Sequence, residues 1–275
     1  MTRRRDATLW VPLAALVLAE IGYPLVAGTA RAGLVVATVV LGYLASVTAA
    51  ALTRGARAAA VLVLVTTGGG LAVEALGVAT GVPFGSYAYG EALGPTLVGV
   101  PVIIPLAWTW MAWPAWLAAG RVVRRSLPLR VLVAGVGLAG WDLFLDPQMV
   151  TEGYWTWADP HPALPGVPQI PVSNYLGWLV VAIVLMALLA WLGGPAVRRP
   201  AATGEAATGD APTGQAAKEP GDAPMLALYL WTYASSVLAH AVFLGLPASA
   251  AWGGLAMGLV AVPLATRLWL DRRRR

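Results

Sequence analysis

Long apolar segments, separated by short polar and arginine-rich ones, account for most of the sequence. Each segment is close to the roughly 20 apolar residues that a helix needs to cross a bilayer. Their length favours transmembrane helices over the buried helices of a soluble protein. We therefore predict an all-α fold, a polytopic membrane helix bundle of about eight transmembrane helices in a single membrane domain. The predicted spans are residues 9–28, 33–53, 58–78, 99–120, 131–147, 175–193, 225–246 and 250–270.

The composition supports the same class of protein. Of the 275 residues, 59% are hydrophobic and only 11% are charged, which is too apolar for a soluble globular domain. Cysteine is absent from the sequence, which excludes disulfides, thiolate metal sites and cysteine nucleophiles. The first residues, MTRRR before an apolar run, are also typical of a signal peptide, but the run is long and contains Glu20. We favour a retained first span.

The basic residues are distributed very unevenly between the two sides that eight spans define. All of the 18 Lys and Arg residues except Arg31 fall in the segments on one side. Because cytoplasmic segments carry the excess of positive charge, both termini are predicted to be cytoplasmic, in a multi-pass protein of the cell membrane. This topology, together with anionic lipid, accounts for the net charge of +5. We therefore expect membrane lipid, and no nucleic acid, as a partner.

Three connecting segments are long enough to have roles of their own. Residues 194–224 are rich in Ala, Gly, Pro and Thr and lack an apolar period, which predicts a flexible cytoplasmic linker without chemistry. On the opposite side, residues 79–98 are rich in Gly, Pro and Tyr and could form a re-entrant loop. Five prolines in residues 148–174 exclude a central strand or a long helix. We expect an ordered, extended lid there, with a mobile loop as the alternative.

Two carboxylates lie four residues apart in the stretch GWDLFLDPQMVTEGYWTW, residues 140–157. Residues at this spacing share a helix face, and ionisable groups inside a span are costly enough to be functional candidates. The predicted topology places Asp142 and Asp146 in the outer half of the fifth span, with Glu74 and His240 at a similar depth in the third and seventh. These four residues are the candidate catalytic groups. Together with Glu20, at or just beyond the middle of the first span, they are five ionisable groups at a similar depth on four helices, which suggests a shared site.

Each polar residue also has a structural alternative. Asp146 could cap a helix that starts at the proline after it, and Asp142 could belong to a structural polar pair. Glu74 and His240 could hydrogen-bond each other between two helices. Glu20, in the first span, we interpret as structural.

Aromatic residues are concentrated in the same outer segments. Trp and Tyr populate membrane interfaces in general, so single residues of this kind are weak indications of a site. Trp108 lies well inside the fourth span, where an interfacial role does not explain it. The candidate substrate-binding residues are Tyr87, Tyr89, Trp108, Trp141, Trp155, Trp157, Asn174 and Trp178.

The pattern of polar residues restricts the chemistry. The sequence contains no Gly-rich phosphate loop, no GxSxG or HExxH motif and no Cys/His cluster, so we expect neither a cofactor nor a metal. A carboxyl group that stays protonated in an apolar pocket can protonate an alkene, and Trp and Tyr faces can stabilise the tertiary carbocation that results. A second carboxylate, or His240, can then accept a proton from attacking water. This chemistry is acid-catalysed hydration of an isoprenoid double bond; without water the same cation gives isomerisation or cyclisation.

Four segments carry a resemblance to a known family: PFGSYAY (83–89), GPTLVGVPVIIPLAW (94–108), GWDLFLDPQMVTEGYWTW (140–157) and GVPQIPVSNYLGW (166–178). They are similar to the membrane carotenoid-biosynthesis family that includes the CruF-type carotenoid hydratases, called bisanhydrobacterioruberin hydratases in haloarchaea. The resemblance covers roughly residues 10–193 and is most specific in the WDxxxDP…GxWxW block. It implies cofactor-independent addition of water to the terminal (1′,2′-type) double bond of an acyclic carotenoid end group, which gives a tertiary alcohol. It also suggests other enzymes of the carotenoid pathway as partners.

Two other classes of function remain open from the sequence. Asp142-x-x-x-Asp146 resembles half of the paired Asp-rich motifs with which UbiA-like prenyltransferases bind Mg-diphosphate, but a second motif is missing and the outer side carries only Arg31. The alternative outside enzymes is a carotenoid or lipid carrier, or a transporter that uses the acids as a proton relay. An enzyme changes the mass of the carotenoid, whereas a carrier changes only its location.

The predicted orientation can be tested with single cysteines, because the native chain has none. Cysteines at Ser86 and His161 should react with a membrane-impermeant thiol reagent added to intact cells, and a cysteine at Thr208 should be protected. Labelling of Thr208→Cys with both outer positions silent would invert the topology.

Overall fold

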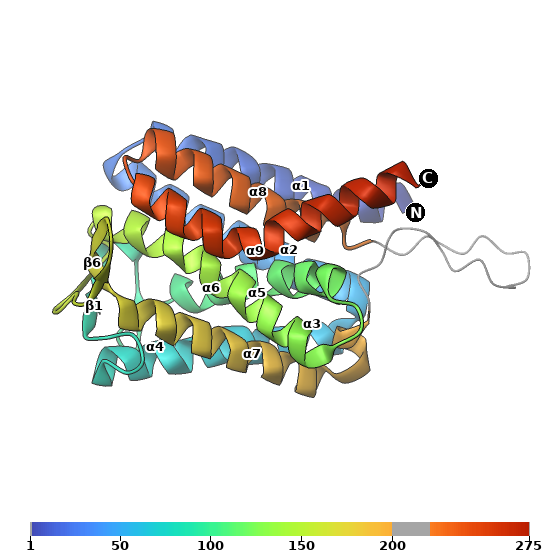
Figure 1. Ribbon diagram of the computed structural model, residues 1–275, viewed down its shortest axis with the longest axis horizontal. Coiled ribbons are helices and arrows are strands. Elements are labelled where there is room, and N and C mark those ends of the chain that lie inside the picture. The colour runs from blue at the N-terminus through green and yellow to red at the C-terminus, as the bar shows by residue number, and fades with distance from the viewer. Residues whose placement is uncertain (1, 200–220, 275) are drawn as a thin grey trace, which may run out of the picture.

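The computed structural model describes residues 2–199 and 221–274, in which the helices form one bundle (Figure 1). Two π-helical segments, η2 (Val63–Gly68) and η4 (Ala239–Phe243), join α3 to α4 and extend α8. Eight long helical segments result within the described chain, which confirms the predicted all-α bundle. The helices are α1 (Thr2–Gly22), α2 (Gly28–Arg54), α3 (Ala56–Leu62), α4 (Gly69–Thr80), α5 (Ile103–Val122), α6 (Leu127–Thr151), α7 (Val172–Arg198), α8 (Ala223–Leu238) and α9 (Pro247–Arg273).

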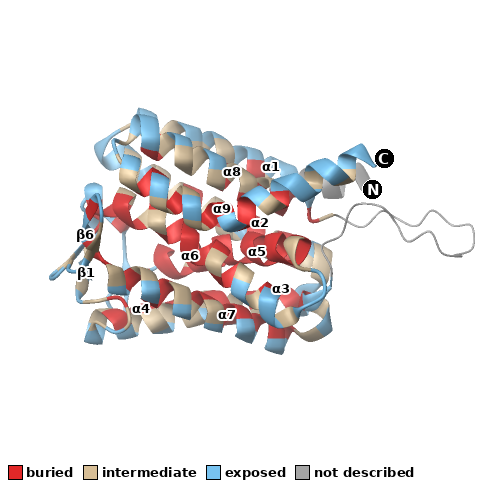
Figure 2. Ribbon diagram, viewed as in Figure 1, coloured by how far each residue is buried: buried red, intermediate tan, exposed pale blue. Residues whose placement is uncertain are grey.

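Seven of these segments are long and apolar enough to cross a membrane. The eighth, α5, corresponds to the predicted span 99–120 and has 20 residues. Four Trp residues and two prolines lower its average hydropathy, yet it is buried along nearly its whole length. It is therefore the central helix of the bundle, enclosed by other helices rather than by lipid (Figure 2).

The strands and the chain ends lie at opposite ends of the bundle (Figure 1). Helix α6 packs against α7 on one side and α9 on the other, and α5 packs against α2 and α6. The start of α1 and the end of α9 lie at the same end, as an even number of spans requires. The acidic part of α6 lies toward the strand end, where it is covered by the connecting segments.

Glycines let α6 approach both of its neighbours closely. A Cβ atom at Gly140 would lie 2.7 Å from the Met257 backbone nitrogen on α9, and one at Gly135 would lie 2.6 Å from Ile183 Cγ1 on α7. Helices in lipid gain little from hydrophobic burial against each other, so close van der Waals packing through small residues holds them together. These contacts set the depth and rotation of the carboxylates that α6 carries.

Helix α6 continues beyond the predicted end of its span. It passes through Pro147 and ends at Thr151, whose hydroxyl donates to the Pro147 carbonyl at 2.7 Å. A proline removes one backbone hydrogen bond from a helix, but the next turn is also closed by the Glu152 amide, which donates to the Gln148 carbonyl at 3.3 Å. Asp146 therefore lies inside the helix, and the alternative in which it caps a helix that starts at the proline is wrong.

Three two-stranded antiparallel ribbons close one end of the bundle (Figure 1). They pair β1 (Tyr87–Tyr89) with β4 (Trp155–Trp157), β2 (Thr96–Leu97) with β3 (Val100–Pro101), and β5 (Ala163–Leu164) with β6 (Val167–Pro171). The β1–β4 pair joins the two outer segments, so residues 79–98 lie at the bundle end with the other strands. Whether they enter the membrane stays a prediction. Residues 148–174 contain only the end of α6, short strands and the start of α7, as their prolines predicted.

Most of the connection between α7 and α8 lies outside the described residues. Helix α7 bends at Gly194 (φ 55°, ψ −146°) and continues to Arg198, and α8 begins at Ala223. Of the predicted linker 194–224, residues 200–220 are not among those that the structure describes. The flexibility of the linker and its side of the membrane stay predictions.

The close packing of α6 on α9 predicts a stability difference between two glycine substitutions. Gly140→Ala should lower the melting temperature of the detergent-solubilised protein, because the new methyl group meets backbone and overpacking costs about 1–3 kcal/mol. Gly33→Ala on α2, where a Cβ meets nothing within 4 Å, should melt at or above the wild-type temperature, since Ala is the better helix former. Thermal unfolding followed by circular dichroism makes the comparison. Equal melting of the two variants would contradict the close approach at Gly140.

Candidate active site

Asp142 and Asp146 form a buried carboxylate pair, one helical turn apart on α6. Asn174, in the first turn of α7, donates from its side-chain nitrogen to both of them, with 3.1 Å to Asp142 Oδ2 and a short contact to Asp146 Oδ2. Trp155 on β4 donates its indole N–H to Asp146 Oδ1 at 3.1 Å. The other oxygen of Asp142, Oδ1, has no hydrogen-bond partner within the described chain. The pair is therefore held by neutral donors only.

Glu74 on α4 is the third buried carboxylate of this region. The Tyr87 and Tyr89 hydroxyls donate to its Oε2 at 2.6 and 2.8 Å, and the Trp108 indole N–H donates to Oε1 at 3.0 Å. Burial, followed by the charge of Glu74, raises the pKa of both Tyr87 and Tyr89 above the ordinary tyrosine value. Both tyrosines thus remain neutral hydroxyl donors, and Glu74, like the aspartate pair, has no cationic partner among these contacts.

The pairing of β1 with β4 brings the aromatic residues of two distant segments together over the carboxylates. Its register places Tyr87 opposite Trp157 and Tyr89 opposite Trp155, and opposite residues of an antiparallel pair have side chains on the same face. The Tyr89 and Trp155 rings meet edge to face at 5.7 Å between centroids. The Trp157 indole N–H donates to the Phe84 carbonyl at 2.8 Å, which fastens the ribbon to the loop before β1. The predicted lid is therefore a β-ribbon.

A small cavity of about 30 Å³, which we call the acid cavity, opens between the carboxylates and these rings. One wall is the stacked pair Trp108 and Trp178, with ring centroids 3.8 Å apart and an interplanar angle of 6°. Asp146 and Glu74 both line the cavity, whereas Asp142 lies behind Asp146. The lining residues are Glu74, Phe84, Tyr87, Tyr89, Ile104, Ala107, Trp108, Leu145, Asp146, Trp155, Trp157, Asn174 and Trp178. Seven of the eight predicted substrate-binding residues are in this set.

His240 lies elsewhere, in the π-helical segment η4. Its Nδ1 is 2.9 Å from Ser249 Oγ and its Nε2 is 3.2 Å from Gln148 Oε1. The alternative in which His240 and Glu74 hydrogen-bond each other is wrong, because the two side chains have separate partners. The expectation that all four candidate catalytic residues share one cavity fails for His240, since η4 packs against α8 and α9 and not against α4.

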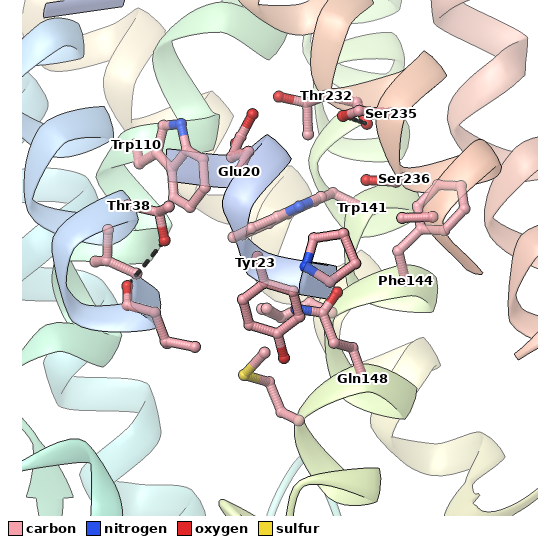
Figure 3. Close-up of a pocket in the computed structure, with 16 residues that line it drawn as sticks. Glu20, Tyr23, Thr38, Trp110, Trp141, Phe144, Gln148, Thr232, Ser235 and Ser236 are labelled. Atoms are coloured by element: carbon pink, nitrogen blue, oxygen red, sulfur yellow. Dashed lines mark hydrogen bonds between the residues drawn. The ribbon is translucent and has the colours of Figure 1, made fainter. Parts of the chain in front are cut away.

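Trp141, the eighth predicted substrate-binding residue, faces a second cavity on the other side of α6 (Figure 3). We call this space of about 110 Å³ the polar cavity. The Trp141 ring meets Trp110 edge to face at 5.3 Å between centroids. Glu20, interpreted as structural from the sequence, lines the same cavity and accepts a 2.5 Å hydrogen bond from the Trp231 indole. The polar lining residues are Glu20, Tyr23, Thr38, Gln148, Thr232, Ser235 and Ser236.

The polar cavity was missed in the sequence although a signal for it exists. Thr232, Ser235 and Ser236 in α8 are spaced so that they share one helix face, and all three line the cavity. Single hydroxyl residues in a span are common, and only their helical spacing sets these apart. Among the described residues no group of three or more Asp, Glu, His or Cys side chains is arranged to hold a metal ion.

Comparisons with known proteins match the part of the chain that forms the acid cavity. Residues 34–207 match the family model of carotenoid biosynthesis proteins, a range that contains all residues lining the acid cavity. The bisanhydrobacterioruberin hydratase of Haloarcula japonica is 34% identical over 122 residues, which cover 42% of this chain and 39% of that protein. The alignment thus spans well under half of the relative's length. No solved structure matches the chain. Because the family model matches most of its length, this chain belongs to the family of carotenoid biosynthesis proteins.

Proposed function

We propose that the protein is a hydratase that adds water to the terminal double bond of an acyclic carotenoid end group and produces a tertiary alcohol. The observation that carries the proposal is the pair Asp142 and Asp146, bridged by Asn174 and opening on a cavity walled by aromatic rings. The similarity to a hydratase of Haloarcula japonica supports the same reaction.

The aspartate pair is suited to act as the acid. Two adjacent negative charges repel strongly where water is scarce, so we expect the pair to hold one shared proton. Asp146 faces the cavity and is the group that can reach an alkene carbon, while Asp142 behind it completes the pair. Transfer of the proton to the less substituted alkene carbon forms a C–H bond and leaves a tertiary carbocation. The bridging Asn174 amide keeps the two carboxyl groups in place throughout.

The walls of the acid cavity are suited to stabilise the cation. The faces of the stacked Trp108 and Trp178 rings present π-electron density, which attracts positive charge. Asp146, once it has lost its proton, and Glu74 add negative charge at the cavity wall. Attack of water forms the C–O bond, and the proton that this water loses returns to Asp146, either directly or after passing through Glu74. The carboxyl groups end in their starting state, so no co-reactant other than water is consumed.

The cavity volume implies that the lid moves during the reaction. This volume is roughly two to three times the minimum that one water molecule needs, which is too little for a branched isoprenoid end group. The β1–β4 ribbon covers the site through side-chain contacts and a single pair of strands. We expect the ribbon to lift when the carotenoid end enters, and its indole and hydroxyl groups to exclude bulk water when it closes.

The lining of the acid cavity disfavours a diphosphate substrate, as a prenyltransferase would need. None of the residues that line this cavity is Lys or Arg. Arg31, the basic residue predicted on this side of the membrane, forms an ion pair with Glu152 and donates to the Val26 carbonyl at 2.7 Å. Diphosphates are bound by cationic groups or metal, and a hydrocarbon end group needs neither.

Expression in a lycopene-producing host tests the proposed reaction directly. Mass spectrometry of the extracted pigments should show a gain of one water for each end that reacts. An unchanged pigment mass, with the protein present in the membrane, would remove the hydratase. The absorption spectrum and chromatographic retention of the pigment would then separate an isomerase or cyclase, which changes them, from a carrier, which does not.

Substitution of the two aspartates separates their roles. Asp146→Asn should lower the hydration rate by about 100-fold or more, because an amide cannot donate the acidic proton and general acid catalysis contributes on this scale. Asp142→Asn should also slow the reaction, because it breaks the shared-proton pair. In heavy water the wild-type product should carry one non-exchangeable deuterium beside the new alcohol, measured by mass spectrometry. Near-normal turnover of Asp146→Asn would transfer the acid role to Asp142 or Glu74, and product without carbon-bound deuterium would exclude alkene protonation.

The lid is tested by conservative changes of its two tryptophans. Trp155→Phe removes the hydrogen bond to Asp146 but keeps an aromatic ring, and it should lower turnover by about 10-fold or more, the value of one bond to a charged group. Trp157→Phe removes only the bond to the Phe84 carbonyl and should have a smaller effect. Turnover is compared per amount of folded protein in the membrane. If activity falls only in proportion to folded protein, these indoles serve packing alone.

A further inference from the structure

The polar cavity has a lining unlike that of the lipid-facing surface around it. A carboxyl group, an amide and several hydroxyls line a space of about 110 Å³ between α1, α2, α6 and α8. In Figure 3, Glu20, Thr232 and Ser235 lie at one end of this space, and Tyr23 and Gln148 lie at the other. Polar side chains inside a membrane bundle are costly unless they are satisfied or serve a purpose. The volume is several times the minimum that one water molecule needs.

Three hydrogen-bonding groups at this cavity have no partner within the described chain. The Thr232 hydroxyl, the Trp110 indole N–H and the Tyr23 hydroxyl are unsatisfied, although the three residues are only 3%, 6% and 7% exposed. All three residues line the polar cavity. An unpaired buried donor costs about 1–3 kcal/mol, and native proteins usually satisfy such groups with ordered water. These three groups therefore point to water as the occupant.

One residue, Leu145 of α6, lines both the polar cavity and the acid cavity. Its neighbours in the helix face opposite ways, with Phe144 lining the polar cavity and Asp146 the acid cavity. Leu145 is partly buried and makes no polar contact, so its rotamer can change at this boundary without breaking a hydrogen bond.

A hydrogen-bonded row of side chains leads from the polar cavity toward the strand end of the bundle. Gln148 lines the polar cavity and contacts His240, which contacts Ser249. Ser249 in turn lines a third cavity, of about 240 Å³, beneath β6. The row joins the space under the end loops to the polar cavity, and it places His240 and its partners outside the acid cavity.

We propose that the polar cavity is a binding site for a small cluster of water molecules, which supplies past Leu145 the water that adds to the carotenoid end group. This inference rests on the proposed hydration. The water enters the acid cavity, its oxygen bonds to the tertiary carbon, and one of its protons passes to Asp146 or Glu74. Because the polar cavity holds this water, the lid can exclude bulk solvent while a water molecule is still available for the hydration.

The presence of water can be tested without any activity. X-ray radiolysis labels aromatic residues that lie next to bound water, even when they are buried. In membranes, Trp110 and Trp141 should be labelled several-fold faster than Trp116, which is also buried, lines neither cavity and donates its indole N–H to the Val197 carbonyl at 3.0 Å. Ser236→Leu, which fills the cavity, should bring the two fast rates down to that of Trp116, and this comparison within one tryptophan removes the effect of small differences in exposure. Equal labelling of the three tryptophans in the wild type would overturn the water site.

The supply of water is tested by the fate of the cation in heavy water. Wild-type protein should give hydrated product and little deuterium in recovered precursor. Thr232→Val keeps the shape of the residue and removes the unpaired hydroxyl, so hydration should fall several-fold while carbon-bound deuterium in the recovered precursor rises. Thr53→Val is the matched control, because the Thr53 hydroxyl bonds within its own helix and lines none of the three cavities.

Two other results would contradict the supply of water from the polar cavity. In the first, Thr232→Val gives the same ratio of hydrated product to deuterated precursor as the wild type. In the second, Thr232→Val lowers the hydrated product and the carbon-bound deuterium in the precursor by the same factor. If the wild type itself neither hydrates nor exchanges, the proposed function fails, and the radiolysis result still decides whether the cavity holds water.

Discussion

Asn174 donates from one amide nitrogen to both Asp142 and Asp146, and the rest of the site is arranged around this contact. Carboxyl groups in the interior of a membrane bundle are tolerated only when hydrogen bonds compensate for lost hydration. The contact ties the first turn of α7 to the part of α6 that lies toward the strand end. The close packing at Gly135 brings the two helices near enough for it, and β6 leads directly into the turn of α7 that carries Asn174.

The carboxylates of the site differ in their partners from the other acids of the bundle. At the end where α1 starts and α9 ends, Asp222 pairs with Arg54 at 2.6 Å and Asp271 with Arg121 at 2.7 Å, and at the strand end Glu152, which does not line the acid cavity, pairs with Arg31. The donors to the aspartate pair and to Glu74 are instead indoles, phenols and an amide. An ion pair holds a carboxylate in its charged form, whereas neutral donors position it and leave both protonation states accessible. This difference suits the carboxylates of the site for acid–base chemistry and the paired acids for structure.

Helix α6 lines both the acid cavity and the polar cavity, because its side chains project from different faces of the helix. The face with Asp142 and Asp146 meets α7 and the lid, while the face with Trp141 and Gln148 meets α1, α2 and α8. Residues 34–207, the range of the family match, contain the acid cavity completely, but α1, α8 and α9 lie outside it. The polar cavity therefore combines a wall shared with the family and a wall from segments outside the match. The residues that hold the proposed acid thus lie wholly inside the family match, whereas those around the proposed water site lie partly outside it.

The sequence by itself determined the class of fold, because a run of about 20 apolar residues has few uses other than crossing a membrane. It also determined the candidate acids, since a carboxyl group in such a run is too costly to be incidental. Only the tertiary structure decided which of them meet. The spacing of Asp142 and Asp146 put them on one face, but the direction of that face followed from helix packing at glycines. The same packing placed Trp141, the sequence neighbour of Asp142, in the other cavity and gave His240 partners other than Glu74. Local spacing is set within one helix, whereas contacts between helices depend on rotations that no single segment encodes.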